Sequence, residues 1–290
     1  MKISIITINY NNAAGIRKTL TSVAEQTYRD IEHIIIDGGS SDESVNVIQD
    51  YVAKVKSEEL RAKSVIWSSE KDKGIYNAMN KGIKRATGEY IQILNSGDIL
   101  AAPDVTQRMV SALAQAKSEE LRGTSKEIGI PILYGNMVKY DYNSNKVIGK
   151  SREVEYSLRQ YYSSTMNHDC CYIHRSVYEK YGLYDESLKI VSDWKWFLQA
   201  IGLGNVKPVY VDIDVTIFDC SGISETNLEL RNKERRQVLE EVLPPAILAD
   251  YDKYAFPMEQ YNRLKKYHLW PIVYFMERVL FKLNKWKILR

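Results

Sequence analysis

Polar and acidic residues follow four segments that have the composition of β-strands. Asn9 comes after one apolar run, Asp37 and Asp72 come after two others, and Asn95 begins an Asn-Ser-Gly-Asp tetrapeptide that ends at Asp98. Carboxylate and amide groups of this kind suit ribose hydroxyls, the edge of a base, or a hard divalent cation that holds phosphates. They can act together only if the fold brings them to one place.

The first hundred residues predict a fold that does so. Apolar, β-branched runs at 3–8, 33–36, 65–67 and 90–94 alternate with helical patterns, one of which covers 74–86. Such strands, separated by helices, are typical of a parallel sheet covered on both faces. Because ligands bind beyond the carboxyl ends of the strands in such sheets, we expect the four polar groups at one edge.

Several shorter patterns predict further elements. Ser40 followed by Glu43 predicts a capping box at the start of the second helix. Pro103 predicts the first turn of another helix, where its missing N–H costs nothing. The polar stretch 117–129 predicts a solvated loop or a helix end. The clearest later elements are a strand at 132–138, helices at 176–181 and 194–200, and a charged helical region at 227–249 that Pro244 and Pro245 interrupt.

Each candidate residue also has a purely structural interpretation. Asp37 precedes two glycines and suits a turn, Asp98 suits a turn before Pro103, and Asp193 suits the N-cap of an apolar helix. The first strand is followed by neither GxGxxG nor GxxxxGKS. This absence weakens the dehydrogenase and P-loop alternatives. The shared position of the acids at strand ends favours a binding role.

Composition narrows the class of protein. The 290 residues are 44% hydrophobic and 27% charged, as in an ordinary globular protein. A net charge of +3 is too small to indicate nucleic-acid binding, and we expect none. The N-terminal apolar run soon turns polar, so it predicts a first strand rather than a signal peptide.

The cysteines favour a reducing compartment. Cys170 and Cys171 are adjacent, and Cys220 makes the count odd. His168 and His174 flank the adjacent pair, but two neighbouring thiolates rarely share one tetrahedral zinc ion. We therefore expect no zinc site.

The C-terminal segment 268–290 combines aromatic, apolar and basic residues. It is too interrupted by charge to span a bilayer. A basic helix with Trp and Phe suits a lipid headgroup interface, so the segment predicts contact with a membrane surface. The alternative is a helix that packs its aromatic face on the catalytic domain or on the second subunit of a homodimer.

Taken in order, four segments resemble the family 2 inverting glycosyltransferases of the GT-A fold, in particular bacterial members that build cell-surface polysaccharides. The segments lie within about residues 1–225, and their order and spacing are more specific than any one of them. They read SIITINYNN, SVAEQTYRDIEHIIIDGGSSDES, SEKDKGIYNAMNKGIKRATGEYIQILNSGD and HDCCYIHRSVYEKYGLYDESLKIVSDWKWFL.

The resemblance implies an α/β, GT-A catalytic domain over 1–225, with a donor half at about 1–100 and an acceptor half at about 130–225. A C-terminal helical extension would follow at 226–290. The implied reaction moves a sugar, with inversion, from a nucleoside-diphosphate sugar to a hydroxyl of a glycan or lipid-linked acceptor. UDP is the commonest nucleotide of the family, and the implied location is the cytoplasm or the inner face of the cell membrane.

The resemblance also assigns roles to individual residues. Asp193 falls at the position of the general base. The tetrapeptide ending at Asp98 occupies the place of an Asp-x-Asp-Asp metal motif, so Asp98 alone would supply a carboxylate to Mn²⁺ or Mg²⁺. The segment 220–224 matches a loop that in relatives closes over the donor. The positions assigned to the donor are Thr7, Asn9, Asp37, Asp72, Asn95, Ser96 and His168.

Two other functions compete with this one. A sugar-nucleotide pyrophosphorylase has a similar sheet, but it usually opens with a glycine-rich loop carrying Arg and Lys, which NYNNAAG lacks. A non-catalytic sugar-nucleotide-binding or scaffold subunit would explain the two acids missing from the metal motif. The retained Asp98 and Asp193 argue against that alternative.

Overall fold

The computed structural model describes residues 1–57, 64–120, 130–141, 144, 146–219 and 227–288. The polar stretch expected at 117–129 is helical as far as Glu120, and its remainder lies outside the described residues, as does the loop at 220–224. The chain divides into two compact units, Met1–Arg236 and Gln237–Arg290.

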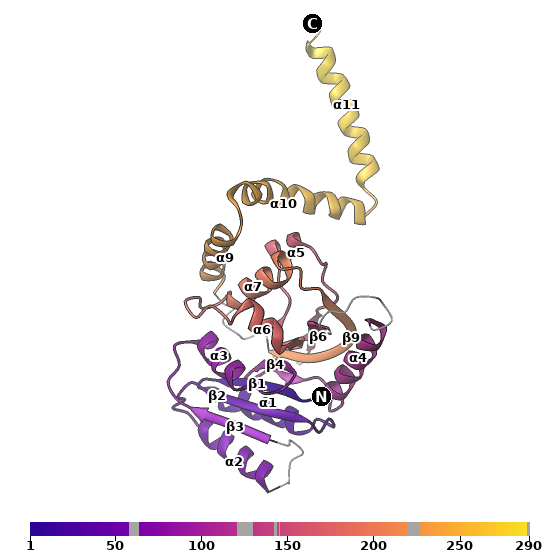
Figure 1. The fold of residues 1–290 in the computed structure, drawn as a ribbon. Coiled ribbons are helices and arrows are strands. Elements are labelled where there is room, and N and C mark those ends of the chain that lie inside the picture. Colours follow the sequence, from indigo (N-terminus) through magenta and orange to yellow (C-terminus); the bar gives the residue numbers. More distant parts are fainter. Residues whose placement is uncertain (58–63, 121–129, 142–143, 145, 220–226, 289–290) are drawn as a thin grey trace. The chain divides into compact units, whose positions relative to one another are not determined.

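The beginning of the first unit alternates strands with helices, as the sequence predicts (Figure 1). Its elements are β1 (Ile3–Asn9), α1 (Ala13–Ala24), β2 (Ile31–Asp37), α2 (Ser44–Lys56), β3 (Ser64–Ser69), α3 (Ile75–Arg85), β4 (Tyr90–Asn95), β5 (Ile99–Leu100) and α4 (Val105–Glu120).

The remainder of the chain adds shorter helices and an antiparallel region. The strand expected at 132–138 and the helix expected at 176–181 are confirmed, and the helix expected at 194–200 is α7 continued by a π-helical segment. The elements are β6 (Ile132–Asp141), β7 (Lys146–Lys150), α5 (Leu158–Ser163), η1 (His168–Cys170), β8 (Cys171–His174), α6 (Arg175–Tyr181), α7 (Ser192–Phe197), η2 (Leu198–Leu203), β9 (Pro208–Asp219), α9 (Leu228–Val242), α10 (Pro245–Lys266) and α11 (Trp270–Ile288).

One mixed sheet of nine strands organises the first unit. The strand order is β3-β2-β1-β4-β8-β6-β9-β5, with β7 paired to β6. Strands β1 to β4 are mutually parallel, whereas β8 runs antiparallel to both β4 and β6. The predicted α/β class is therefore confirmed, and the four strands predicted in the first hundred residues, β1 to β4, form a parallel part of this sheet.

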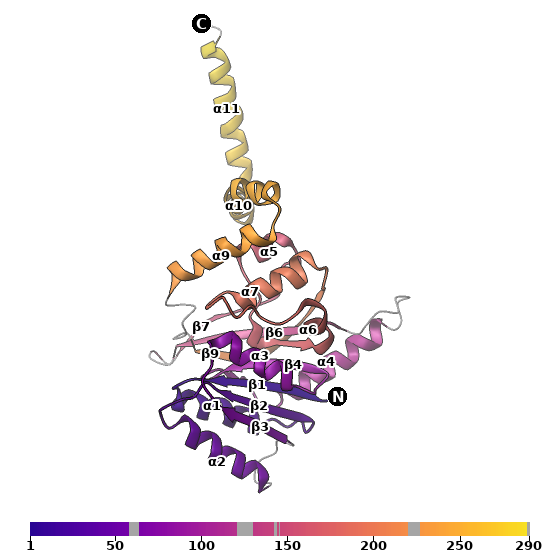
Figure 2. The ribbon, with the colours of Figure 1, turned by 60° about the vertical axis from the view of Figure 1, so that its left-hand side comes forward.

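Helices cover both faces of the parallel part. On one face, Ile16 of α1 and Ile48 of α2 pack in a buried cluster with Ile35 of β2. On the other face, Gly82 of α3 lies so close to Ile6 that no β-carbon would fit there. Figures 1 and 2 both show α2 and α3 on opposite sides of these strands. This double cover explains why the strands are apolar along almost their whole length.

Two local predictions about helix starts are wrong. The second helix begins at Ser44, and its N-cap, Glu43, forms no side-chain capping bond. The Ser40 hydroxyl instead donates to Asp37, at 2.6 Å. Pro103 lies two residues before the first residue of α4, where its carbonyl accepts a hydrogen bond from the backbone N–H of Thr27. Ser40 and Pro103 therefore lie in the connections that precede α2 and α4, where they make tertiary contacts.

A polar chain crosses the core between the sheet and α2. The Nε2 atom of His33 lies 2.9 Å from the Thr7 hydroxyl, and its Nδ1 atom lies 2.8 Å from the Tyr51 hydroxyl. All three side chains are buried. Both ring nitrogens therefore have partners, and the imidazole stays neutral because burial lowers the pKa of His33 to about 3.

Acid should destabilise the fold through His33. An unfolded histidine titrates near pH ~6.5, so between pH 6.5 and 3 the unfolded chain binds a proton that the folded chain does not. Above pH 6.5 the neutral ring makes its full contribution to the free energy of unfolding. Below pH 6.5 this contribution falls by about 1.4 kcal/mol for each pH unit. In urea unfolding, the free energy of unfolding of the wild type should therefore drop by about 2 kcal/mol more between pH 6.5 and 5 than that of His33→Gln.

The exposed His268 supplies the control for this experiment. The variant His268→Gln should retain the pH dependence of the wild type. Equal pH dependence in His33→Gln and the wild type would show that His33 is not the titrating group.

Candidate active site

The carboxyl ends of the parallel strands form one polar edge. Asn9 lies opposite Asp37, and Asp37 lies opposite Ser69, so three strands end in register. On the other side of β1, Asn95 pairs with Ile8. A cavity of about 480 Å³ opens at this edge, which is large enough for a small ligand. It is lined by Ile8, Asn9, Tyr10, Gly38, Lys71, Asp72, Gly74, Ile75, Ala78, Asn95 and Ser96.

Asp37 is the centre of a hydrogen-bond network beneath this cavity. Its Oδ1 accepts from Asn9 Nδ2 at 2.8 Å, and its Oδ2 accepts from the Ser69 hydroxyl at 2.6 Å and the backbone N–H of Ser40 at 2.9 Å. The carboxylate is fully buried. Burial acts to raise its pKa, but the donors, led by Ser40 and Ser69, outweigh burial and hold the pKa of Asp37 below its usual value.

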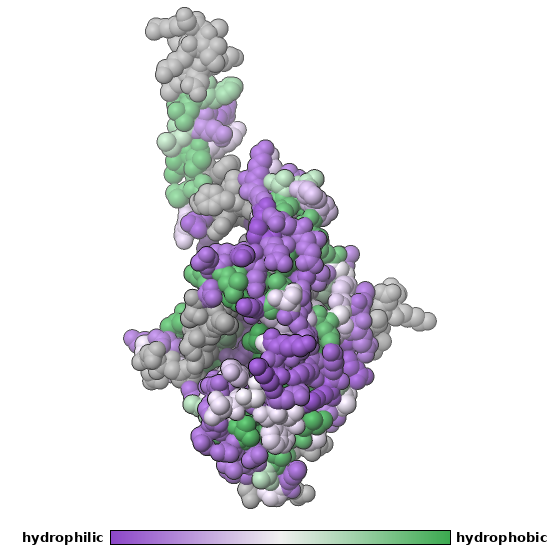
Figure 3. Space-filling model, turned by 90° about the vertical axis from the view of Figure 1, so that its left-hand side faces the viewer, coloured by the Kyte–Doolittle hydropathy of each residue, from purple (hydrophilic) through white to green (hydrophobic). Residues whose placement is uncertain are grey.

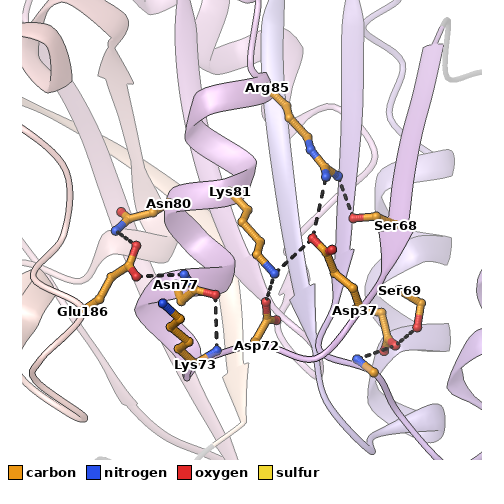
Figure 4. A network of polar contacts seen from close by, with 12 residues as sticks. Asp37, Ser68, Ser69, Asp72, Lys73, Asn77, Asn80, Lys81, Arg85 and Glu186 are labelled. Carbon is orange, nitrogen blue, oxygen red and sulfur yellow. Dashed lines mark hydrogen bonds and ion pairs between the residues drawn. The ribbon is translucent and has the colours of Figure 1, made fainter.

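Asp72 lies at the cavity wall and is held by a cation. Its carboxylate accepts from Lys81 Nζ at 2.6 Å, and Lys81 also contacts Glu70 at 3.1 Å. Figure 4 shows Lys81 reaching Asp72 from α3. A β-carbon at Gly38 would lie 3.1 Å from Asp72 Oδ2 and 3.2 Å from the Tyr10 ring. Glycine at this position therefore keeps the space between these two side chains open.

Thr7 occupies a different place from the other donor candidates. It is fully buried in the middle of β1, faces α2 through His33, and does not line the cavity. Asn9, Asp72, Asn95 and Ser96 do line it. The edge thus brings together most of the predicted donor residues and leaves Thr7 in the core.

A second cavity, of about 150 Å³, contains the predicted base. His168 and Asp193 both line it, and their side chains are 16% and 18% exposed. His168 Nδ1 donates to Asp193 Oδ2 at 3.2 Å, and the buried Tyr76 hydroxyl lies 2.9 Å from Asp193 Oδ1. His168 Nε2 lies 3.4 Å from Asn95 Nδ2, so His168 and Asn95 join the two cavities.

Electrostatics make this cluster an ion pair at neutral pH. Burial disfavours the charged imidazole, but the hydrogen bond and charge of Asp193, with the charges of Asp169 and Asp98, raise the pKa of His168 to about 8. Burial likewise acts to raise the pKa of Asp193, whereas His168 and then Tyr76 lower it below its usual value. Asp193 is therefore an ionised carboxylate held at both oxygens.

Asp193 does not cap its helix. The N-cap of α7 is Val191, and Asp193 lies inside the first turn. The structural interpretation of Asp193 as an N-cap is therefore wrong. A carboxylate in the first turn still interacts favourably with the positive end of a helix.

The residues around Asp98 suit a hard cation whose remaining ligands are oxygen atoms of phosphate groups and water. Asp98 is 3% exposed, and the amide oxygen of Asn95, three residues earlier, is buried with no hydrogen-bond partner. Within the described part of the chain, no group of three or more His, Cys, Asp or Glu side chains is placed to hold a metal. A cation here would need phosphate and water oxygens to complete its coordination. Cys170 and Cys171 are buried free thiols.

Three kinds of site residue were not predicted from the sequence. Tyr76 supports Asp193 from α3, although the two are far apart in the chain. Tyr10 presents an aromatic ring, 66% exposed, at the cavity beyond the strand ends. Arg231 and Arg235 of α9 line the second cavity. Tyr10 follows Asn9 directly and could have been found from its strand-end position, but no local pattern connects Tyr76 or the arginines to Asp193.

Comparisons with known proteins agree with this arrangement. Residues 4–182 match the family model described as glycosyl transferase family 2. An uncharacterised glycosyltransferase of Mycobacterium tuberculosis (strain CDC 1551 / Oshkosh) is 31% identical over 227 residues, which are 76% of this chain and 76% of that protein.

Two solved structures share the fold. Staphylococcus aureus TarS 1–349 in complex with UDP-GlcNAc is 19% identical, with a TM-score of 0.60 over 82% of this chain and 64% of that one. The mannosyltransferase PcManGT from Pyrobaculum calidifontis, in complex with GDP-Man and Mn²⁺, is 17% identical, with a TM-score of 0.58 over 88% of this chain and 69% of that one. The sheet is thus that of the GT-A fold, and the chain belongs to glycosyl transferase family 2.

Proposed function

We propose that this glycosyltransferase transfers a sugar from a nucleoside-diphosphate sugar to an acceptor hydroxyl with inversion, in the biosynthesis of a cell-surface polysaccharide. The observation that carries the proposal is the position of Asp193. This ionised, partly exposed carboxylate lines the smaller cavity. His168 of the smaller cavity lies beside Asn95, which lines the larger cavity beyond the strand ends. A donor in one cavity and an acceptor in the other would meet beside Asp193.

The larger cavity is the proposed site of the nucleotide. It offers the exposed ring of Tyr10 for stacking and the carboxylate of Asp72 for hydroxyl groups. Asp37 would act indirectly, since its hydrogen bonds fix Asn9 and the loop after β2. The TarS and PcManGT structures contain UDP-GlcNAc and GDP-Man, which supports a nucleotide sugar as donor, with UDP as our proposed nucleotide.

Asp98 and Asn95 are the proposed protein ligands of Mn²⁺ or Mg²⁺. Both offer the hard oxygen atoms that these ions prefer. PcManGT was solved with Mn²⁺, which supports a divalent cation. When bound, the ion would offset negative charge on the departing nucleoside diphosphate.

Asp193 is the proposed general base of a single displacement. The proton of the acceptor O–H passes to the carboxylate while that oxygen bonds to the anomeric carbon. The bond from that carbon to the donor phosphate breaks on the opposite side, and the nucleoside diphosphate leaves with the electron pair. Tyr76 and His168 hold Asp193 in one orientation, and its remaining lone pairs are available to the acceptor hydroxyl.

A non-catalytic sugar-nucleotide-binding subunit is the alternative function. It would have no use for a partly exposed carboxylate placed between an imidazolium and a tyrosine. Slow, metal-dependent release of nucleoside diphosphate from a donor sugar would separate the enzyme from such a subunit.

The second unit supports a proposed contact with a membrane surface. Helix α11 exposes Phe275, Leu280 and Phe281 to 68%, 60% and 72%, and Figure 3 shows hydrophobic surface along this helix. No helix in the described ranges is both long and apolar enough to cross a bilayer. An amphipathic helix of this kind would hold the enzyme at the inner face of the cell membrane, near a lipid-linked or glycan acceptor. A homodimer that buries the same helix is the competing proposal.

Replacing the base should stop catalysis without unfolding the protein. Asp193→Asn keeps the side-chain volume and removes the proton acceptor, so transfer should fall by about 10²–10⁴-fold. Single-turnover transfer assays would measure the loss, with Asp104→Asn, which removes an exposed carboxylate before α4, as the matched control. Near-normal turnover in Asp193→Asn would remove this residue from the mechanism.

Metal-dependent donor binding should depend more on Asp98 than on Asn95. Asp98→Ala should abolish the gain in UDP affinity that Mn²⁺ provides, whereas Asn95→Ala should weaken it only several-fold, because a neutral amide binds a divalent cation less strongly than a carboxylate. Calorimetric titration of UDP with and without Mn²⁺ measures both variants. A greater loss in Asn95→Ala would reverse the assignment.

Removal of 268–290 should abolish binding to membranes and leave the catalytic unit folded. The full-length protein should sediment with anionic liposomes at low salt, since each basic residue near such a surface adds about 1 kcal/mol. Phe275→Ser combined with Leu280→Ser preserves the charge and should also weaken sedimentation, with neutral liposomes as the control. Failure of the full-length protein to bind anionic liposomes, or unfolding of the truncated protein, would favour a packed helix.

A further inference from the structure

Besides His168, three basic side chains border the cavity that contains Asp193. Lys139 comes from β6, and Arg231 and Arg235 come from α9, far away in the sequence. Much of the remaining wall is apolar, with Met137 and Phe218 among its residues. Cationic groups set in an apolar wall attract an anion strongly, because the low dielectric strengthens charge interactions.

A buried glutamate fixes the helix that carries the two arginines. Glu234 is 6% exposed, and its two carboxylate oxygens accept from the backbone N–H groups of Lys189 at 2.8 Å and Ile190 at 2.9 Å. These N–H groups belong to the loop that leads into α7. Because residues three and four apart share one face of a helix, Arg231 lies on the same face as Glu234 and Arg235. Both arginines of the anchored helix line the cavity that contains Asp193.

Arg235 is held in place by an aromatic ring and a backbone carbonyl. Its guanidinium lies 5.0 Å from the centre of the Trp194 ring, and its Nη1 donates to the Ser163 carbonyl at 3.2 Å. Its Nε is buried and has no hydrogen-bond partner. Burial and the neighbouring positive charge of Arg231 both lower the pKa of Arg235, while Asp193 acts in the opposite direction. Helix α9 thus places two positive charges side by side at the cavity wall, and a bound anion would interact favourably with both.

We propose that Arg231 and Arg235, with Lys139, bind an oxyanion carried by the acceptor, so that the enzyme glycosylates a phosphate- or carboxylate-bearing sugar or polyol. This inference rests on the proposed function, because it takes the Asp193 cavity to be the acceptor site. Guanidinium groups match the planar geometry of two carboxylate or phosphate oxygens. The anion would be anchored at α9 and would present a nearby hydroxyl of the same molecule to Asp193.

Small anionic sugars test the inference directly. Glucose 6-phosphate, glucuronate and glucose are titrated into the full-length protein in the presence of UDP and Mn²⁺. The wild type should bind one or both anions at least about tenfold more tightly than glucose, as two charge-assisted contacts imply. A preference for the phosphate or for the uronate identifies the source of the anion. Arg231→Gln combined with Arg235→Gln should remove the preference and change the affinity for UDP less than about twofold.

Matched variants make the result specific. Arg175→Gln removes an exposed arginine of α6 outside the cavity and should leave the preference intact. If the double variant unfolds because Arg235 no longer packs on Trp194, Arg231→Gln alone should still weaken the preference. Equal binding of glucose and both anions by the wild type would overturn the inference, and so would a fall in UDP affinity in the arginine variants, which would assign these residues to the donor diphosphate.

The inference and the proposed function can fail separately. If the wild type binds no UDP in the presence of Mn²⁺, the nucleotide-sugar proposal fails. Titrations of the two anions without nucleotide still measure whether the arginine cavity prefers an oxyanion.

Discussion

The parallel, in-register pairing of β1 to β4 is the constraint on which the site depends. Because the strands run in one direction and stop at the same level, their last residues lie side by side, and the connections that follow all begin at one edge. Asp37 makes that edge rigid. Its carboxylate accepts hydrogen bonds from Asn9 and Ser69, the last residues of β1 and β3, and from Ser40 in the loop after β2, and so ties the three strand ends together.

The second half of the site has a different physical basis. There, side chains from separate elements converge on one carboxylate, and electrostatics hold them together. Tyr76 comes from α3, His168 from a short helical turn after α5, and Asp193 from α7. The imidazolium stabilises the charge on Asp193 and so keeps it ionised. It also reduces the basicity of the carboxylate, so in the proposed mechanism the position of Asp193, more than its proton affinity, supplies the catalytic advantage.

The sequence predicts the sheet well because apolar periodicity and glycine turns are local signals. The strand ends therefore identify Asn9, Asp37, Asp72 and Asn95 correctly as neighbours. The depth of a residue along its strand is harder to predict: Thr7 lies on the same face of β1 as Asn9, but two residues before the strand end, in the core, where it contacts His33.

Predictions failed where long-range contacts compete with local patterns. Ser40 has the composition of a cap but bonds to Asp37, which the fold brings close. The link between Tyr76 and Asp193 spans more than a hundred residues, and no spacing rule in a single sequence connects them.

The anchoring of α9 by Glu234 has a consequence for how acceptor recognition can change. One carboxylate holds the helix to the loop before α7, where two backbone N–H groups have no strand partner and would be left unsatisfied without it. The helix is thus held through Glu234, with further contacts from Arg235 to Trp194 and to the Ser163 carbonyl. Substitutions at Arg231 and Arg235 can change the wall of the proposed acceptor cavity while the GT-A sheet and Asp193 stay unchanged. Because Glu234 bonds only to backbone N–H groups, its contact does not depend on the side chains of Lys189 and Ile190, and those positions can vary without loss of this anchor.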